Sequence, residues 1–331
     1  MKDIIPTVKI TNFAGVTSIK DGMKSNVYSK IDKEAKPPWI RISAQSSNKN
    51  FELIKSKVKS LQLSTVCEEA KCPNLSECWS RGTATFMIMG DTCTRACQFC
   101  SVNTGNPKGW LDKDEPAKIA DTVDAMGIKY VVLTCVTRDD LVDGGAAHFA
   151  KTAKMIKKKN SSIEVEVLTS DFNGNLSALE KVVNSPIKVF AQNIETVERL
   201  THPIRDPRAG YKKTLDILSA AKKINKKIIT KSSIILGLGE SDKEITQTFR
   251  DLRDAGVDIV TLGQYLRPTL NHHPIDRWVK PEEFERYRDI GLSYGFLEVV
   301  SGPMVRSSYR AERALESVSY THLRAHETLR Y

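Results

Sequence analysis

The sequence predicts an α/β protein whose main body is an open, partial barrel of six strand–helix units. From Thr85 onward, short apolar runs alternate with amphipathic segments, and each pair takes roughly 30–40 residues, as in βαβ units. A complete barrel of this TIM type has eight units, so about six units favour an open arc of parallel strands. Six of the seven cysteines lie in one stretch where this alternation begins.

The predicted strands are short apolar runs, and the predicted helices carry apolar residues at intervals of three and four. We expect strands at 84–90, 129–134, 163–168, 187–191, 228–236, 258–263 and 296–300. We expect helices at 115–126, 146–159, 176–183 and 211–223, one opening at 241–244 and one starting at Pro281. Pro116 suits a first helical turn, and the Ser-Asp-Lys-Glu sequence of 241–244 is a capping box.

The first 60 residues are polar and only weakly periodic. Phe51, Ile54, Val58 and Leu61 have helical spacing, which predicts a helix that leads toward the first cysteines. Pro37 and Pro38 favour an extended segment, so we expect an arm that lies on the barrel surface.

Composition and charge restrict the class of protein. The chain has 331 residues, of which 40% are hydrophobic and 27% charged, as in a globular protein. No apolar run approaches the roughly 20 residues of a membrane helix, and no secretory signal is evident. We therefore expect a cytoplasmic protein, with its thiols reduced. Much of the net charge of +10 comes from lysines such as those in 151–159 and 222–227, which suit the C-terminal ends of surface helices. A nucleic-acid surface is the alternative, but no aromatic interleaving or binding motif accompanies these lysines, so we expect no nucleic-acid partner.

The cysteines form two triplets of different spacing, Cys67-x4-Cys72-x5-Cys78 and Cys93-x3-Cys97-x2-Cys100. The second triplet follows the strand 84–90, at the strand end where parallel α/β folds keep their active sites. Disulfides do not suit reduced thiols. Zinc prefers four ligands in paired short spacings, and every histidine lies beyond residue 140. An iron–sulfur cluster with one open iron fits three thiolates best.

The x3–x2 spacing, with Phe99 before the last cysteine, resembles the radical S-adenosylmethionine (SAM) superfamily, whose fold is also a partial barrel. The preceding x4–x5 triplet, together with the Arg-Ser-Ser-Tyr sequence at 306–309, makes the chain similar to the lipoyl synthase family over roughly residues 36–313. The resemblance implies that Cys93, Cys97 and Cys100 bind the [4Fe–4S] cluster that cleaves SAM. It implies a second, auxiliary [4Fe–4S] cluster on Cys67, Cys72, Cys78 and Ser308, with Ser307 as the second choice for the serine ligand.

The same resemblance suggests residues that contact SAM. Asp139, Asp140, Gly144 and Gly145 lie in a loop after the second strand, and Asn193 and Glu195 follow the fourth. The glycines expose N–H groups to a ligand or simply form a turn, and Arg138, Asp139 and Asp140 bind a ligand or cap a helix. Glu195 hydrogen-bonds a ribose or is an acid in the first turn of a helix. His202, His272 and His273 lack metal spacing, and we expect them at the surface.

The implied function is insertion of two sulfur atoms, at carbons 6 and 8, into an octanoyl chain on a lysine of a lipoyl carrier domain, with the auxiliary cluster as sulfur donor. Such carriers are the acyltransferase subunits of 2-oxoacid dehydrogenases and the glycine cleavage H protein. Flavodoxin or ferredoxin would supply electrons, and an iron–sulfur carrier protein would supply clusters. Another radical SAM sulfur-insertion enzyme similar to biotin synthase, and a non-catalytic iron–sulfur scaffold, are the alternatives.

The expected domain boundaries follow from these assignments. Residues 1–80 form an extension that carries the auxiliary-cluster cysteines, residues 81–295 the barrel, and residues 296–317 the segment with the serine motif. Residues 318–328 match one reading frame of a transposase-type sequencing adapter, so we expect 318–331 to be an artefact that replaces the natural C-terminus.

Overall fold

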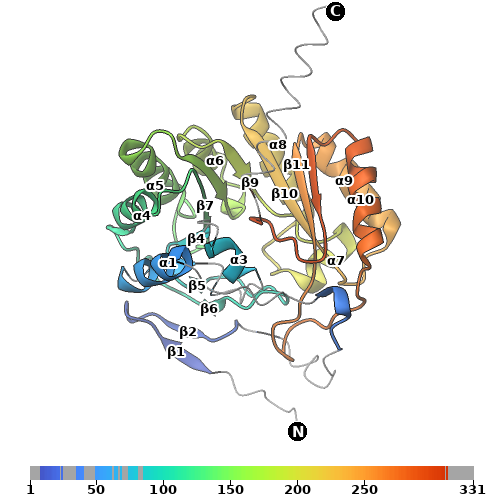
Figure 1. Ribbon diagram of the computed structural model, residues 1–331, viewed down its shortest axis with the longest axis horizontal. Coiled ribbons are helices and arrows are strands. Elements are labelled where there is room, and N and C mark those ends of the chain that lie inside the picture. Colours follow the sequence, from blue (N-terminus) through green and yellow to red (C-terminus); the bar gives the residue numbers. More distant parts are fainter. Residues whose placement is uncertain are drawn as a thin grey trace, which may run out of the picture.

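A computed structural model describes residues 8–22, 24, 35–40, 49–61, 63–65, 68, 74–80, 85–309 and 311. Its main body is an eight-stranded sheet in the order β12-β11-β10-β9-β8-β7-β4-β3 (Figure 1). All neighbours are parallel except β3 and β4. The strands are β3 (Ser64–Thr65), β4 (Thr85–Ile88), β7 (Tyr130–Cys135), β8 (Glu164–Leu168), β9 (Val189–Ala191), β10 (Ile229–Leu236), β11 (Ile259–Gln264) and β12 (Glu298–Ser301).

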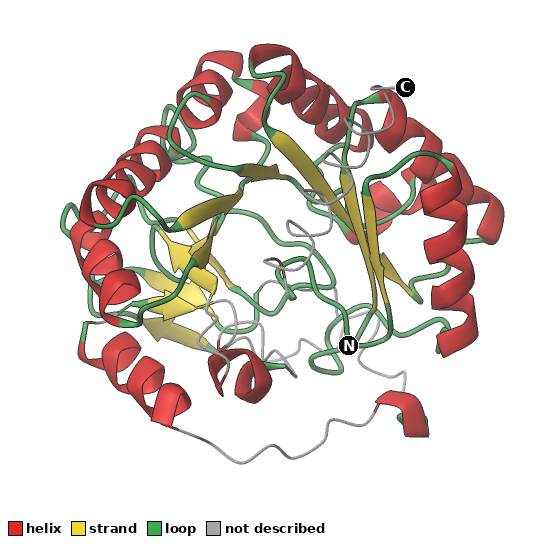
Figure 2. Cartoon of the chain, turned by 45° about the horizontal axis from the view of Figure 1, so that its top comes forward, coloured by secondary structure: helices red, strands yellow, loops and turns green. Residues whose placement is uncertain are grey.

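Helices cover the outer face of this sheet in an incomplete ring, and the strands form an arc within it (Figure 2). The helices are α4 (Glu115–Ala125), α5 (Ala146–Lys159), α6 (Leu176–Val183), α7 (Glu198–Ile204), α8 (Tyr211–Ile224), α9 (Asp242–Asp254) and α10 (Pro281–Ser293). In the described chain the two edge strands, β3 and β12, each pair on one side only. The predicted open barrel of six strand–helix units is therefore confirmed, with β12 as a further strand.

The core lies between the sheet and its helices. Phe149 of α5, Leu218 of α8 and Phe249 of α9 are fully buried against strand residues such as Leu133 and Phe190. Burying each such side chain contributes roughly 1.5–3 kcal/mol to the free energy of folding. The capping box predicted at the start of α9 is present, because Ser241 and Glu244 each accept a hydrogen bond from the backbone N–H of the other.

A second, smaller sheet was not predicted. Its order is β1-β2-β6-β5, with β1 (Lys9–Thr11), β2 (Thr17–Ile19), β5 (Thr92–Cys93) and β6 (Asn103–Gly105). The N-terminal hairpin β1–β2 thus pairs with a strand that follows the second cysteine triplet. The N-terminal residues that the structure describes therefore lie beside the second triplet.

The remaining N-terminal elements are α1 (Lys49–Ser60), the short α3 (Leu75–Ser80) and the 3-10 turn η2 (Pro38–Ile40). Trp79 of α3 is buried, and its ring centroid lies 5.5 Å from that of Phe51 in the predicted helix α1. At η2, the indole Nε1 of Trp39 donates to the carbonyl of Val279, just before α10. This contact is consistent with the arm predicted on the barrel surface, but the predicted extended conformation is wrong at Pro38–Ile40, which form a 3-10 turn.

After β12 the chain turns back across the inner face of the sheet. The carbonyl of Val305 lies so close to β11 that a Cβ on Gly263 would approach its oxygen to 2.0 Å, which explains the glycine. Ala311 packs with Tyr130, Val132 and Val189 of the parallel strands. This path carries the Arg-Ser-Ser-Tyr segment into the arc.

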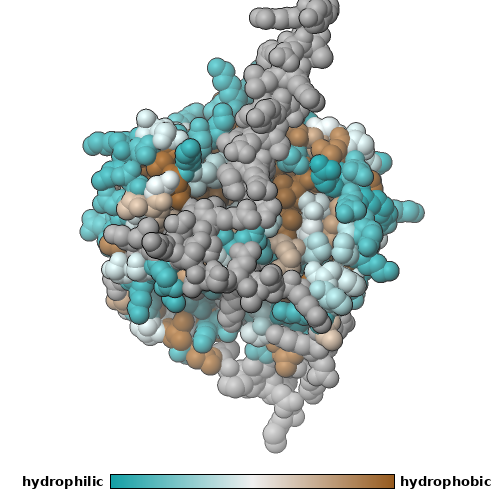
Figure 3. Space-filling model, viewed as in Figure 1, coloured by the Kyte–Doolittle hydropathy of each residue, from teal (hydrophilic) through white to brown (hydrophobic). Residues whose placement is uncertain are grey.

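The outward faces of the flanking helices are mainly hydrophilic in the view of Figure 3. Exposed lysines such as Lys154 and Lys158 of α5 contribute to this surface. Among the described residues, no helix combines the length and the apolar composition that crossing a membrane requires.

Candidate functional site

The second cysteine triplet lies in the connection from β4 to β6, at the carboxyl end of the first barrel strand. Cys93, Cys97 and Cys100 are partly buried and form no disulfide. The backbone N–H of Arg95 donates to Sγ of Cys93 at 3.4 Å, and that of Asp206 donates to Sγ of Cys97 at 3.3 Å. Amides aimed at sulfur stabilise negative charge there, as in metal-bound thiolates.

Burial raises the pKa of all three thiols, and it raises that of Cys100 to about 12. Free thiols at this site would therefore stay protonated at neutral pH, and a bound metal would displace the protons. Within the described ranges, no three Cys, His, Asp or Glu side chains converge on a point suited to a single metal ion. Three thiols in one loop suit a cubane cluster, in which each thiolate binds a separate iron atom.

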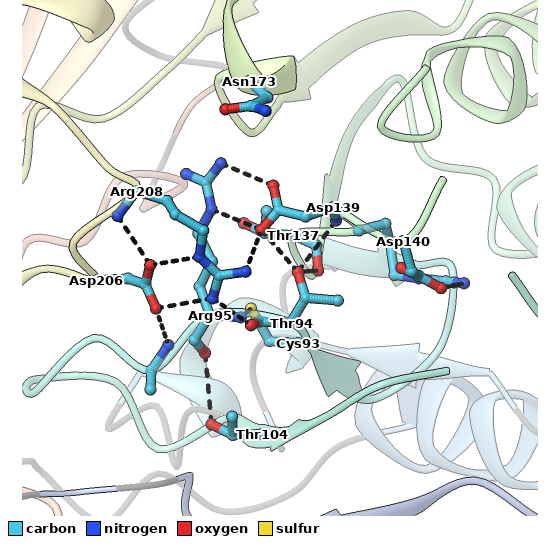
Figure 4. A network of polar contacts seen from close by, with 12 residues as sticks. Cys93, Thr94, Arg95, Thr104, Thr137, Asp139, Asp140, Asn173, Asp206 and Arg208 are labelled. Atoms are coloured by element: carbon cyan, nitrogen blue, oxygen red, sulfur yellow. Dashed lines mark hydrogen bonds and ion pairs between the residues drawn. The ribbon is translucent and has the colours of Figure 1, made fainter. Parts of the chain in front are cut away.

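A buried ion-pair network holds this loop (Figure 4). Arg95 donates to both carboxylate oxygens of Asp171, at 2.8 and 2.7 Å, and to both of Asp139, at 3.0 and 2.9 Å. Its side chain is only 5% exposed, so these pairs are shielded from water. Because Asp139 follows β7 and Asp171 follows β8, the network ties the cysteine loop to two neighbouring strand ends.

A second pair fastens the loop from the side of α8. Asp206 accepts from the N–H of Ala96, and its carboxylate is bound by Arg208. Arg208 also donates to the carbonyl of Thr94 and lies 3.1 Å from Asp139. The segment before α8 thus contacts the backbone on both sides of Arg95.

The predicted SAM-contacting loop after β7 is largely occupied by contacts within the protein. Asp139 pairs with Arg95, and Asp140 pairs with the fully buried Arg138. The N–H of Gly144 donates to the carbonyl of Leu141, and that of Gly145 to the carboxylate of Asp143. The expectation that the glycines expose unpaired N–H groups is therefore wrong. That Asp139, Asp140, Gly144 and Gly145 bind SAM stays a prediction.

Both glycines have a structural explanation. Gly144 and Gly145 have φ values of 58° and 89°, which favour glycine. A Cβ on Gly145 would lie 2.0 Å from Sδ of Met89, and one on Gly144 3.1 Å from the Phe172 ring. Close packing of the loop against Met89, just after β4, and against the turn η3 (Phe172–Gly174) requires their small size.

Glu195 has a geometry that the sequence did not reveal. It precedes α7 and its N-cap Val197, so the alternative of a first-turn helix acid is wrong. Its φ is 69°, and it lies beside Ile234 of β10, where its N–H donates to the carbonyl of Ser233 and its carbonyl accepts from the N–H of Ile235. Burial raises the pKa of its carboxyl group, although Arg205 and Asn193 oppose that shift. The charge of Glu195 also acts on Cys97, so it lies at the candidate site.

Several residues of this site were missed or misjudged. His272 is fully buried, contrary to the expected surface position, and its Nε2 lies 3.1 Å from the carbonyl of Cys100. His273 donates its N–H to the carbonyl of Gln98, so the connection after β11 closes over the cysteine loop. His202 is exposed, as expected. Gln192, which directly follows β9, is buried, and neither the oxygen nor the nitrogen of its side-chain amide has a hydrogen-bond partner.

The first triplet is described only at Cys78, because Cys67 and Cys72 lie outside the described residues. Cys78 is in α3, and both this helix and Asn74, just before it, contact the C-terminal segment. Nδ2 of Asn74 donates to the carbonyl of Met304 at 2.7 Å, and the hydroxyl of Tyr309 lies 3.2 Å from Oε1 of Glu77. The structure therefore brings together the segments that contain Cys78 and Ser308.

Comparison with known proteins agrees with this architecture. Residues 87–252 match the model of the radical SAM superfamily. The FeFe-hydrogenase maturase HydG from Carboxydothermus hydrogenoformans has a similar fold, with a TM-score of 0.54 at 15% identity over 81% of this chain and 69% of that one. Another crystal structure of HydG gives a TM-score of 0.52 at 15% identity, over 83% and 67% of the two chains. The fold and the second triplet thus define a radical SAM protein.

The particular family follows from closer relatives. Residues 12–72 match the N-terminal domain of lipoyl synthase. The lipoyl synthase of Ectopseudomonas mendocina is 54% identical over 95% of this chain and 90% of that protein. Those of Marinobacter nauticus and Francisella tularensis subsp. novicida are 56% and 55% identical, each over 93% of this chain and over 89% and 94% of those proteins. The chain belongs to the lipoyl synthase family of sulfur-inserting radical SAM enzymes, which implies SAM, [4Fe–4S] clusters and lipoyl carrier proteins as substrates.

Proposed function

We propose that this protein inserts sulfur at carbons 6 and 8 of an octanoyl chain, which is carried on a lysine of a lipoyl carrier domain. The contact between α3 and the 304–309 segment is the structural observation that best supports it. That contact puts Cys78 and Ser308 on adjoining segments, as a shared auxiliary cluster requires. The second triplet alone does not explain why the segments with Cys78 and Ser308 are in contact.

In this proposal, Cys93, Cys97 and Cys100 hold the SAM-cleaving cluster, and Cys67, Cys72, Cys78 and Ser308 hold the auxiliary one. When bound, the first cluster with SAM supplies a 5′-deoxyadenosyl radical, and the auxiliary cluster supplies sulfur. A hydroxyl oxygen is a weaker ligand for iron than a thiolate, so Ser308 would be the most weakly held of the four ligands.

The other residues of the site bind and orient. Arg95, Asp139 and Asp171 fix the cysteine loop, which sets where its thiolates point. Asn193 and Glu195 are suited to hydroxyl or amino groups of SAM, because both side chains are polar and partly buried and Glu195 acts on Cys97. Asp140, Gly144 and Gly145 would line the SAM site from the loop after β7. The loop with His272 helps to exclude water from the site. A highly reactive radical requires this exclusion, because water would allow side reactions.

The finer assignments belong to the same proposal. The carriers are acyltransferase subunits of 2-oxoacid dehydrogenases and the glycine cleavage H protein, and the reaction takes place in the bacterial cytoplasm. A flavodoxin or ferredoxin delivers electrons, and an iron–sulfur carrier protein rebuilds the auxiliary cluster. Residues 1–80, 81–295 and 296–317 form the three functional parts, and 318–331 belong to none of them.

Anaerobic turnover tests the proposal. The cluster-loaded protein is mixed with SAM, a reductant and an octanoyl-lysyl peptide, and the mass of the peptide is then measured by mass spectrometry. We expect a product that has gained two sulfur atoms, together with released 5′-deoxyadenosine. Deoxyadenosine without any sulfur in the peptide would refute the proposed reaction, although the SAM-cleaving site would stand.

A further inference from the structure

The N-terminal hairpin is built onto the second cysteine triplet. Strand β2 pairs antiparallel with β6, with Ser18 opposite Gly105 and Ile19 opposite Thr104. Side chains add to the pairing, since Nδ2 of Asn12 donates to the carboxylate of Asp91 at 2.8 Å. The hairpin is thereby attached on both sides of the cysteine loop, which runs from β5 to β6.

Lys24 extends this attachment to the loop itself. Its Nζ donates to the carbonyl oxygen of Cys97 at 2.6 Å. Gly22 makes room for the side chain, because a Cβ there would lie 2.9 Å from both Nζ of Lys24 and the carbonyl oxygen of Val102. With a φ of 75°, Gly22 also allows the turn that leads from β2 to Lys24.

Burial lowers the pKa of Lys24, whereas Cys100, Cys97 and Cys93 as thiolates act on its ammonium group in the opposite direction. The carboxylate of Asp21 acts on the ammonium group of Lys24 in the same direction as the thiolates. Other cations also lie near the loop: Arg95 and Arg208 pair with carboxylates, and the charge of Arg205 acts on Cys97. Lys24 supplies the positive charge that acts most strongly on Cys100.

We propose that Lys24 is a positioning residue for the SAM-cleaving cluster: it fixes the backbone at Cys97 and stabilises the extra negative charge of the reduced cluster. This inference rests on the proposed role of Cys93, Cys97 and Cys100 as cluster ligands. Reduction adds one electron to a cluster that already has three thiolate ligands. A partly buried cation beside it favours the reduced form, since charges interact more strongly away from water, and so raises the reduction potential.

The test compares Lys24→Met and Lys24→Arg with Lys20→Met, which removes the same charge from an exposed lysine of the hairpin. All are made in a Cys67→Ala/Cys72→Ala/Cys78→Ala background, so that only the SAM-cleaving cluster is observed. The potential is measured by anaerobic titration, with the electron paramagnetic resonance signal of the reduced cluster as readout. We expect a lower potential in Lys24→Met, recovery in Lys24→Arg, and no change in Lys20→Met.

Equal potentials in Lys24→Met and its parent, at equal iron content, would overturn the inference, as would failure of Lys24→Arg to restore the parent value. If Lys24→Met does not load iron, Gly22→Ala serves as a second variant, since it displaces Lys24 without removing its charge. A lowered potential in Gly22→Ala supports the inference, and an unchanged one overturns it. A parent that loads no cluster on Cys93, Cys97 and Cys100 would instead refute the proposed function.

Discussion

The hydroxyl of Tyr309 lies 3.2 Å from Oε1 and 3.3 Å from Oε2 of Glu77, although 232 positions separate the two residues in the chain. Each is next to a proposed ligand of the auxiliary cluster, Cys78 in α3 and Ser308 in the C-terminal segment. The hydrogen bond therefore holds the two ends of the chain in the arrangement that a shared cluster needs.

Tyr309→Phe should weaken this arrangement. The variant loses a hydrogen bond to a carboxylate, which is worth roughly 1.5–3 kcal/mol. We expect faster loss of iron from the auxiliary cluster, measured as iron released to a chelator over time, with the SAM-cleaving cluster retained. Tyr294→Phe is the matched control, because its hydroxyl accepts from Arg250 on the outer surface. Equal iron release from both variants would contradict the account.

Arg95→Met should destabilise the protein strongly. It leaves Asp139 and Asp171 without their main buried partner, and breaking such a pair costs about 3–5 kcal/mol. Arg199→Met removes an arginine that is 59% exposed and pairs with Glu244, so about 1 kcal/mol or less is expected. Urea unfolding of the cluster-free chains checks both values. If Arg95→Met lowers the free energy of unfolding no more than Arg199→Met does, the network does not hold the loop.

The contact of Asp206 with the cysteine loop should fail in acid. Burial alone would raise the pKa of Asp206, but hydrogen bonds from Arg208 and Ala96 outweigh it and lower the pKa to about 2. Because the pKa in the unfolded chain is about 3.9, the carboxylate stabilises the fold above that pH and loses this effect as pH falls toward 2.

Wild type should therefore lose roughly 1–2 kcal/mol of stability through Asp206 between about pH 4 and pH 2. Asp206→Asn should be less stable at neutral pH and should lack this part of the acid response. Asp216→Asn, in an exposed pair with Lys212, is the control. Unfolding midpoints of the cluster-free chain across that range provide the measurement. Parallel pH curves for wild type and Asp206→Asn would contradict the assignment.

The two cysteine triplets should be separable by mutation. Cys93→Ala should abolish SAM cleavage, because the site then lacks a proposed cluster ligand. Cys67→Ala should still release deoxyadenosine but insert no sulfur. Chromatography of deoxyadenosine and mass spectrometry of the peptide, run on the same samples, provide both readouts. Sulfur insertion by Cys67→Ala would exclude the auxiliary cluster as donor.

The barrel could be predicted because each of its units has a local signal. Apolar runs such as 129–134 alternate with helices such as α9, which opens with a capping box, and these patterns depend only on neighbouring residues. The hairpin β1–β2 could not be predicted in this way. Its strands have three residues each, and they are stabilised by pairing with β6, far along the chain.

The cysteines of the candidate site could be singled out from the sequence, because their spacing is visible there. The positions of the residues that surround them could not. His272 is buried because a connection folds back over Cys100, and Glu195 has a left-handed backbone that no spacing indicates. Arg95 and Lys24 act through partners that only the fold brings near. The roles of the six cysteines and Ser308 as cluster ligands stay predictions, and Cys67 and Cys72 also lie outside the described residues.

The origin of the inserted sulfur tests the central claim most directly. The protein is reconstituted with sulfide of a heavy sulfur isotope, freed of excess sulfide, and allowed a single turnover on the octanoyl-lysyl peptide without any other sulfur source. The account predicts one product per chain, with both inserted sulfur atoms labelled. Unlabelled sulfur in the peptide, or deoxyadenosine release with no sulfur inserted, would contradict it.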